Sequence, residues 1–98
     1  MWQEVVEVTK QRRHRFQLYY EILSAVELVI MNEGNAKPTR VQHLSNMSYD
    51  RLKRHFVELD KTGLLSTKDG AVFLTDKGRD FLRNYNQLTN IMHAIGFD

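Results

Sequence analysis

The chain has 98 residues, a length that suits one domain with a modest hydrophobic core. Its apolar content of 42% and its single proline are typical of a folded chain rather than a disordered one. The absence of cysteine excludes disulfide bonds, thiol catalysis and zinc sites built from cysteine. The net charge of +2 permits nucleic-acid binding without arguing for it, so the distribution of charge matters more than its total.

The sequence gives no sign of a metal site, a cofactor or a membrane span. The histidines are scattered and lack the spacing of metal ligands. The longest apolar run, residues 25–31, contains Glu27 and is too short to cross a bilayer. No leader is recognisable, since no basic region precedes the first apolar residues. We therefore expect a soluble, cytoplasmic protein that needs no metal or cofactor.

The first twelve residues show neither helical nor strand periodicity, and residues 1–11 are treated as an N-terminal extension. Trp2 is expected to pack on the domain or on a partner, unless the terminus is disordered. Residues 10–15, KQRRHR, hold four cationic side chains and no acidic one. This basic run is either a solvated helix start or an arm that reaches DNA.

From residue 13 to residue 32, apolar residues recur at helical spacing over a wide arc. A helix with such an arc is expected to be central and covered on more than one side. The polar segment 32–35 ends it. Lys37 precedes Pro38 and is therefore biased to an extended conformation, which favours a short strand.

A short helix is predicted to begin at Thr39. Thr39 and Gln42 match a capping box, in which each side chain bonds to a backbone N–H group left free at the helix start. Residues 45–47 then break this helix.

A second helix is predicted after this break. Ser48 caps its start, Asp50 lies in its first turn, where the helix dipole favours a negative charge, and Gly63 ends it with a positive φ angle. Four apolar residues in this helix recur at spacings of three, four and three, and are expected to be buried together. They are Tyr49, Leu52, Phe56 and Leu59.

The opposite face of this second helix is polar and partly cationic. It carries Asp50, Arg51, Arg54, Val57, Glu58 and Lys61, with Lys53 at its flank. A helix that is anchored on one side and offers Arg and Lys on the other can enter the DNA major groove, where Arg pairs with guanine or phosphate. The alternative is an ordinary solvated face on a helical hairpin.

The periodicity changes to that of a β-hairpin after Gly63. Residues 64–67 and 71–74 are predicted to be strands, joined by a turn at residues 68–70, because Asp-Gly supplies the positive φ angles of a tight hairpin. Thr75 then caps a last helix that is expected to end near residue 93 or 95.

The last helix carries an apolar seam of heptad type, with spacings of four, three, four and three. It consists of Phe81, Tyr85, Leu88, Met92 and Ile95. Part of the seam can lie on the first helix, while its C-terminal part extends past what a small domain can cover. This favours a homodimer, and the alternative is a helix folded back over its own core.

Three segments, in register and in order, resemble one protein family. They are RRHRFQLYYEIL (12–23), PTRVQHLSNMSYDRLKRHFVELDKTGLL (38–65) and LTDKGRDFLRNYNQL (74–88), and the likeness covers residues 12 to about 90. The family is that of small archaeal winged helix-turn-helix DNA-binding proteins and predicted transcriptional regulators. Its dimeric members carry a C-terminal antiparallel coiled coil. The resemblance implies a mainly α fold with a small β-hairpin, in which residues 12–75 form the winged helix-turn-helix core and residues 76–98 the dimerisation helix.

The resemblance also implies DNA contacts, made by a recognition helix at residues 48–62 and a wing at residues 68–71. The base-edge candidates are Ser48, Asp50, Arg51 and Arg54. The phosphate candidates are Thr39, Arg40, His43, Lys53 and Lys68. The chain departs from the family in its short wing, which holds one cation, and in its last helix, which is short for a coiled coil. Asp50 and Glu58 would repel phosphate unless they are paired, for example Asp50 with Arg54.

The leading hypothesis is a homodimeric DNA-binding protein that regulates transcription. Two alternatives stay open: a winged-helix module that binds only protein, and an architectural protein that coats DNA without reading its sequence. An enzyme is not expected. Its one candidate set, His55, Asp60 and Lys61, comes without a phosphate loop, a nucleophilic serine elbow or a metal cluster.

Overall fold

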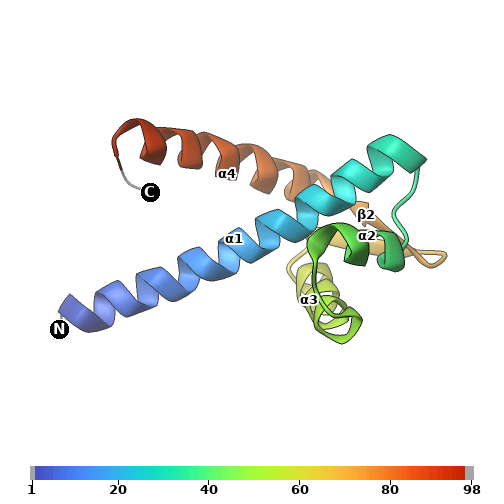
Figure 1. Ribbon diagram of the computed structural model, residues 1–98, viewed down its shortest axis with the longest axis horizontal. Coiled ribbons are helices and arrows are strands. Elements are labelled where there is room, and N and C mark those ends of the chain that lie inside the picture. Colours follow the sequence, from blue (N-terminus) through green and yellow to red (C-terminus); the bar gives the residue numbers. More distant parts are fainter. Residues whose placement is uncertain (1, 97–98) are drawn as a thin grey trace.

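A computed structural model describes the backbone of residues 2–96 and the side chains of residues 15–96. Within that range four helices and one antiparallel hairpin follow each other along the chain (Figure 1). They are α1 (Trp2–Glu33), α2 (Pro38–Ser45), α3 (Tyr49–Lys61), β1 (Leu65–Lys68), β2 (Ala71–Leu74) and α4 (Asp76–Ala94). The predicted mainly α fold with a small hairpin is confirmed.

Helix α1 begins at Trp2, eleven residues before the predicted start at residue 13. Residues 2–12 contain no glycine or proline, so a helix that has already nucleated can extend through them at little cost. Figure 1 shows this N-terminal half projecting from the rest of the molecule, which explains why its sequence lacks the periodicity of a packed helix. The expected packing of Trp2 lies outside the described side chains, as do most residues of the basic run 10–15.

The C-terminal half of α1 is the centre of the core. It contacts α2, α4 and β2, so the expectation of a helix covered on several sides is confirmed. Burying its apolar side chains removes their surface from water, at about 25 cal/mol per Å² of apolar area. The largest fully buried side chains, from α1, α2 and α3, are Ile22, Leu23, Val26, Val29, Val41, Leu52 and Leu59.

The start of α2 differs from the prediction. Pro38 occupies the first turn and Lys37 is the N-cap residue, with no capping hydrogen bond from a side chain. Thr39 is therefore already inside the helix, and the expected capping box with Gln42 does not form. The physical reason is Pro38, whose fixed φ angle and missing N–H group suit the first helical position. Before it, Ala36 makes a single bridge to Val72 of the hairpin, in place of a strand.

The turn between α2 and α3 has the predicted chemistry. Asn46 takes a left-handed conformation with φ of 58° and ends α2. Ser48 caps α3, because its Oγ accepts a hydrogen bond from the Arg51 backbone N–H at 3.3 Å. Gly63 follows the last turn of α3 with φ of 81°, a conformation that glycine adopts without steric cost.

The predicted hairpin is present, but its first strand spans Leu65–Lys68 instead of residues 64–67, so Lys68 belongs to the strand and not to the turn. Lys68 pairs with Ala71 at the end of the two strands, and the residues between them, Asp69 and Gly70, have φ angles of 53° and 76°. Positive φ at both central residues is typical of the type I′ turn, whose twist matches that of the flanking strands.

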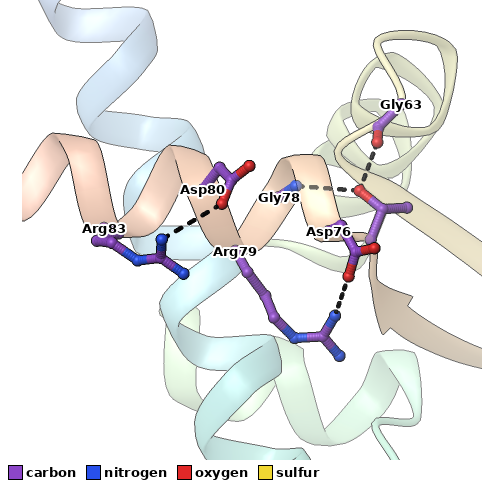
Figure 2. Close-up of polar contacts among 7 residues, drawn as sticks. Gly63, Asp76, Gly78, Arg79, Asp80 and Arg83 are labelled. Atoms are coloured by element: carbon purple, nitrogen blue, oxygen red, sulfur yellow. Dashed lines mark hydrogen bonds and ion pairs between the residues drawn. The ribbon is translucent and has the colours of Figure 1, made fainter.

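Helix α4 is tied to the end of α3 at its first turn. The Thr75 hydroxyl caps α4 by accepting from the Gly78 backbone N–H and donates to the carbonyl oxygen of Gly63 (Figure 2). The Lys77 Nζ donates to the carbonyl oxygen of Thr62 at 2.7 Å, near the free carbonyl groups at the C-terminal end of α3. These bonds fix the start of α4 relative to the end of α3.

Gly78 allows the close approach of α4 to the start of the hairpin. A Cβ atom at this position would clash with the carbonyl oxygen of Leu64, which belongs to the backbone and cannot swing away. Two ion pairs, Asp76–Arg79 and Asp80–Arg83, lie exposed on the surface of α4 (Figure 2). Exposed pairs of this kind contribute little to stability.

Candidate nucleic-acid interface

Helix α3 has two opposite sides. Leu52 and Leu59 are fully buried, and Phe56 is half-buried against the core. Tyr49, which was expected in the same buried stripe, is 42% exposed because it is the first residue of α3 and lies at the edge of the core. The core therefore anchors the middle and the C-terminal part of the helix.

The side of α3 that faces away from the core forms an outward stripe at spacings of four, three and four residues. All four of its members are exposed. The spacing keeps these side chains on one line along the helix, because an α-helix has 3.6 residues per turn. The outward stripe consists of Asp50, Arg54, Val57 and Lys61.

The two arginines predicted to contact bases are accessible. Arg51 and Arg54 are both exposed, Arg54 in the outward stripe and Arg51 at its flank. Neither side chain forms an ion pair with any of the side chains described, residues 15–96, and the suggested pair between Asp50 and Arg54 is not formed there. Their guanidinium groups are thus free to bind an anion or a base edge. Ser48, the fourth base-edge candidate, is also exposed.

Glu58, in contrast, is held toward α1. Its Oε2 accepts a hydrogen bond from the Tyr19 hydroxyl at 3.2 Å and lies 3.4 Å from Nδ1 of His55. Burial raises the pKa of Tyr19, and the nearby charge of Glu58 together with their hydrogen bond raises it further, because both favour the neutral phenol. Glu58, one of the two carboxylates that were expected to repel phosphate, therefore has partners inside the domain.

The phosphate candidates lie on three elements and are all exposed. Thr39, Arg40 and His43 belong to α2, Lys53 to α3, and Lys68 to the end of β1 beside the turn. Arg40 is already engaged, because its Nε lies 3.0 Å from Oε2 of Glu33. The structure packs α2 and β1 against α3, which brings these elements together around α3.

The predicted dimer seam on α4 divides into two parts. Phe81 and Tyr85 are half-buried and contact α1: Phe81 lies edge-on to Phe16 at 6.2 Å between ring centroids, and Tyr85 stacks on Tyr20 at 4.6 Å. The expectation that part of the seam lies on the first helix is confirmed.

The second part of the seam lies beyond this contact. Leu88 and Ile95 are 55% and 63% exposed, and Met92 is half-buried. Ile91, beside the seam, is 59% exposed. Figure 1 shows this end of α4 and the N-terminal half of α1 diverging from each other, away from α3 and the hairpin.

Sequence reasoning missed some residues that shape this surface. The bond between Tyr19 and Glu58 joins positions 39 residues apart, and no local pattern signals it. The hydrogen bond from the Tyr20 hydroxyl to Asn86 at 2.8 Å is of the same kind. Lys61 was placed on the exposed face but not among the contacts, although its spacing from Arg54 signals membership of the outward stripe.

No helix within the described residues 2–96 is long and apolar enough to cross a membrane. Among the same residues, no group of three or more His, Cys, Asp and Glu side chains lies close enough to hold a metal ion.

The comparisons with known proteins agree with this architecture. A crystal structure of a Pseudomonas aeruginosa protein, proposed to be a transcriptional regulator, matches with a TM-score of 0.60 and 22% sequence identity. The match covers 94% of this chain and 73% of the other, and it shows a shared fold. None of the curated proteins matches the sequence. The model of one family, described as winged helix-turn-helix, matches residues 12–93, and the chain belongs to that family.

Proposed function

We propose that this protein binds double-stranded DNA as a homodimer and regulates transcription, with residues 48–62 as the recognition helix in the major groove. The observation that carries the proposal is the outward stripe of α3, where Arg54 is exposed and unpaired among the described side chains while Leu52 and Leu59 fix the opposite side. A helix fixed in this way presents its polar groups in constant positions. The P. aeruginosa protein of the same fold, itself proposed to be a transcriptional regulator, supports the assignment.

Base reading is assigned to the N-terminal half of α3. Arg54 and Arg51 can donate two hydrogen bonds each to O6 and N7 of guanine. The exposed carboxylate of Asp50 can accept from the amino group of cytosine. The Ser48 hydroxyl already accepts from the Arg51 N–H, so its hydrogen is left for a base or a phosphate oxygen.

Phosphate binding is assigned to the residues around that helix, which set its orientation without reading sequence. Thr39, His43, Lys53 and Lys68 are exposed and ready for this role. Arg40 can join them by exchanging its surface ion pair with Glu33 for a phosphate, because exposed pairs of this kind are weak. Binding should therefore weaken steeply as the salt concentration rises.

Dimerisation is assigned to the end of the molecule opposite the hairpin. The outer part of the α4 seam, Leu88, Met92 and Ile95, would pack against a second copy, in the manner of the antiparallel coiled coil that the family resemblance implies. Phe81 and Tyr85 would continue this interface where α4 leaves α1. Two recognition helices placed about 34–36 Å apart would meet successive major-groove faces of one duplex. The corresponding location is the cytoplasm, in association with the nucleoid.

The experiment that tests this function is selection of bound sequences from a random duplex pool, followed by titration of the enriched duplex. An enriched inverted repeat supports a dimeric regulator, and retention without enrichment indicates an architectural protein. Arg54→Ala is expected to cost about 1–3 kcal/mol of binding free energy and to relax discrimination at one base pair.

The matched control for Arg54 is Arg83→Ala, which removes an exposed arginine of α4 that is remote in sequence from α3. It should leave the affinity for the enriched duplex within twofold. Equal affinities for wild type and Arg54→Ala would remove Arg54 from the interface.

The exposed apolar residues of α4 favour one alternative, a module that binds only protein. The affinity for duplex DNA at low salt separates the two functions. A Kd weaker than about 10⁻⁴ M would lie below ordinary non-specific DNA binding and would favour the protein-only module.

A further inference from the structure

Val57 is the one apolar member of the outward stripe on α3. It is 51% exposed, and its neighbours in the stripe, Arg54 and Lys61, are exposed charged residues. A β-branched residue is a poor choice for an exposed helix position, because its χ1 freedom is lost and little burial compensates for the loss. The domain itself therefore gains little from a valine at this position.

The chemistry of the major groove narrows what Val57 can contact. Among the base edges exposed there, the C5-methyl group of thymine is the apolar feature, and the remaining groups are hydrogen-bond donors and acceptors. Val57 has no polar side-chain atom, so it cannot bond to them. A thymine methyl is thus the base feature that pairs favourably with this side chain.

The position of Val57 fixes where that thymine lies. Three residues separate it from Arg54, which corresponds to about 4.5 Å along the helix at 1.5 Å per residue. Base pairs are stacked about 3.4 Å apart. With α3 running along the major groove, a valine on the same stripe as Arg54 would therefore meet a base pair one or two steps from the one that Arg54 reads.

We infer that Val57 is a specificity-determining residue that contacts the C5-methyl group of a thymine one or two base pairs from the site of Arg54. This inference rests on the proposed function, because it requires α3 to lie in the major groove. It adds a hydrophobic contact to a surface that is otherwise assigned to charged and hydroxyl groups.

The test uses the full chain and the duplex enriched from the random pool, with each thymine replaced in turn by deoxyuridine. This replacement deletes one methyl group and leaves all hydrogen-bonding groups in place. One such change is expected to weaken wild-type binding roughly fourfold, the factor that corresponds to burial of one methyl group at about 0.8 kcal/mol. The same change should leave the affinity of Val57→Ala unaltered. The variant should remain folded, because alanine is the better helix former.

Met31→Ala is the matched control, since Met31 is an apolar residue of α1 that is 75% exposed. It should keep the full sensitivity to deoxyuridine. A wild type that is indifferent to every replacement, or a Val57→Ala variant that is equally sensitive, overturns the inference and leaves DNA binding intact. Retention of DNA without sequence enrichment also overturns the inference and leaves DNA binding intact. No duplex binding at low salt removes the proposed function, and the inference with it.

Discussion

The body of the molecule and the projecting end of α4 differ in how far their apolar residues are buried. In the body, which comprises α2, α3, the hairpin and the adjoining parts of α1 and α4, side chains such as Ile22, Leu52 and Leu82 are buried. At the free end of α4, Leu88 and Ile95 continue the same periodic pattern and remain exposed. The body therefore buries its apolar side chains within one chain, whereas the projecting end of α4 leaves its apolar side chains exposed. The periodic spacing of apolar residues alone does not distinguish residues that are buried in the body from residues that are exposed at the end of α4.

The largest effect is expected in the body. Leu52→Ala should lower the free energy of unfolding by about 2–5 kcal/mol, because the side chain is fully buried and its removal leaves a cavity between α3 and the core. Urea unfolding followed by circular dichroism measures this. A loss below 1 kcal/mol would contradict a tightly packed body.

The close approach of α4 to the start of the hairpin comes next. Gly78→Ala should destabilise the protein by about 1–3 kcal/mol, since the new Cβ meets the Leu64 carbonyl oxygen and forces the backbone to shift. Asn84→Ala is the control, an exposed position in the same helix that should change stability by less than about 0.5 kcal/mol. Thermal unfolding of the two variants side by side shows whether the close approach exists.

A smaller effect is expected at the contact between α1 and α3. Tyr19→Phe removes a hydrogen bond to Glu58, whose carboxylate is half exposed, and should cost about 1 kcal/mol. The pKa of Tyr19 is raised in the folded state. The protonated phenol therefore contributes to the free energy of unfolding fully below pH 10, and this contribution is lost as the pH rises above 10. The difference in unfolding free energy between wild type and variant should therefore shrink above pH 10. A constant difference would exclude this linkage.

The smallest effect on unfolding is expected at the projecting end. Leu88→Ala should change the stability of the monomer by less than about 0.5 kcal/mol, because the side chain is 55% exposed. The effect of the substitution should appear in dimerisation. Removing a side chain that the proposed dimer would bury should raise the dimer dissociation constant tenfold or more, equivalent to about 1.4 kcal/mol. Sedimentation equilibrium measures the constant. If wild type is monomeric at every concentration tested, the proposed homodimer is wrong.

The sequence predicted those features that depend on neighbouring residues. The caps at Ser48 and Thr75 and the turn at Asp69 and Gly70 each involve atoms within three residues of one another, so local chemistry determines them. Thr39 was assigned to the wrong position because Pro38 competes for the helix start. The N-terminal half of α1 was missed because its residues show no helical periodicity, and only the ribbon shows that the helix continues outward through them (Figure 1).

The candidate site was predictable to a similar degree. The period of α3 indicated which residues face outward, and the exposure of Arg51 and Arg54 agrees with it. The roles of these residues at DNA stay predictions. The partners of Glu58 were not accessible from the sequence, because a bond to Tyr19 depends on how α1 and α3 pack in three dimensions.

The bonds of Thr75 to Gly63 and of Lys77 to Thr62 have a consequence for how such a regulator could diverge. They lock the direction of α4 to that of α3, so in the proposed dimer the separation of the two half-sites is determined at this joint and along α4. The identity of each half-site would be determined by Ser48 and the base-reading side chains of α3. Spacing and sequence preference could then be altered independently, by grafting a different α4 or by exchanging a few side chains of α3.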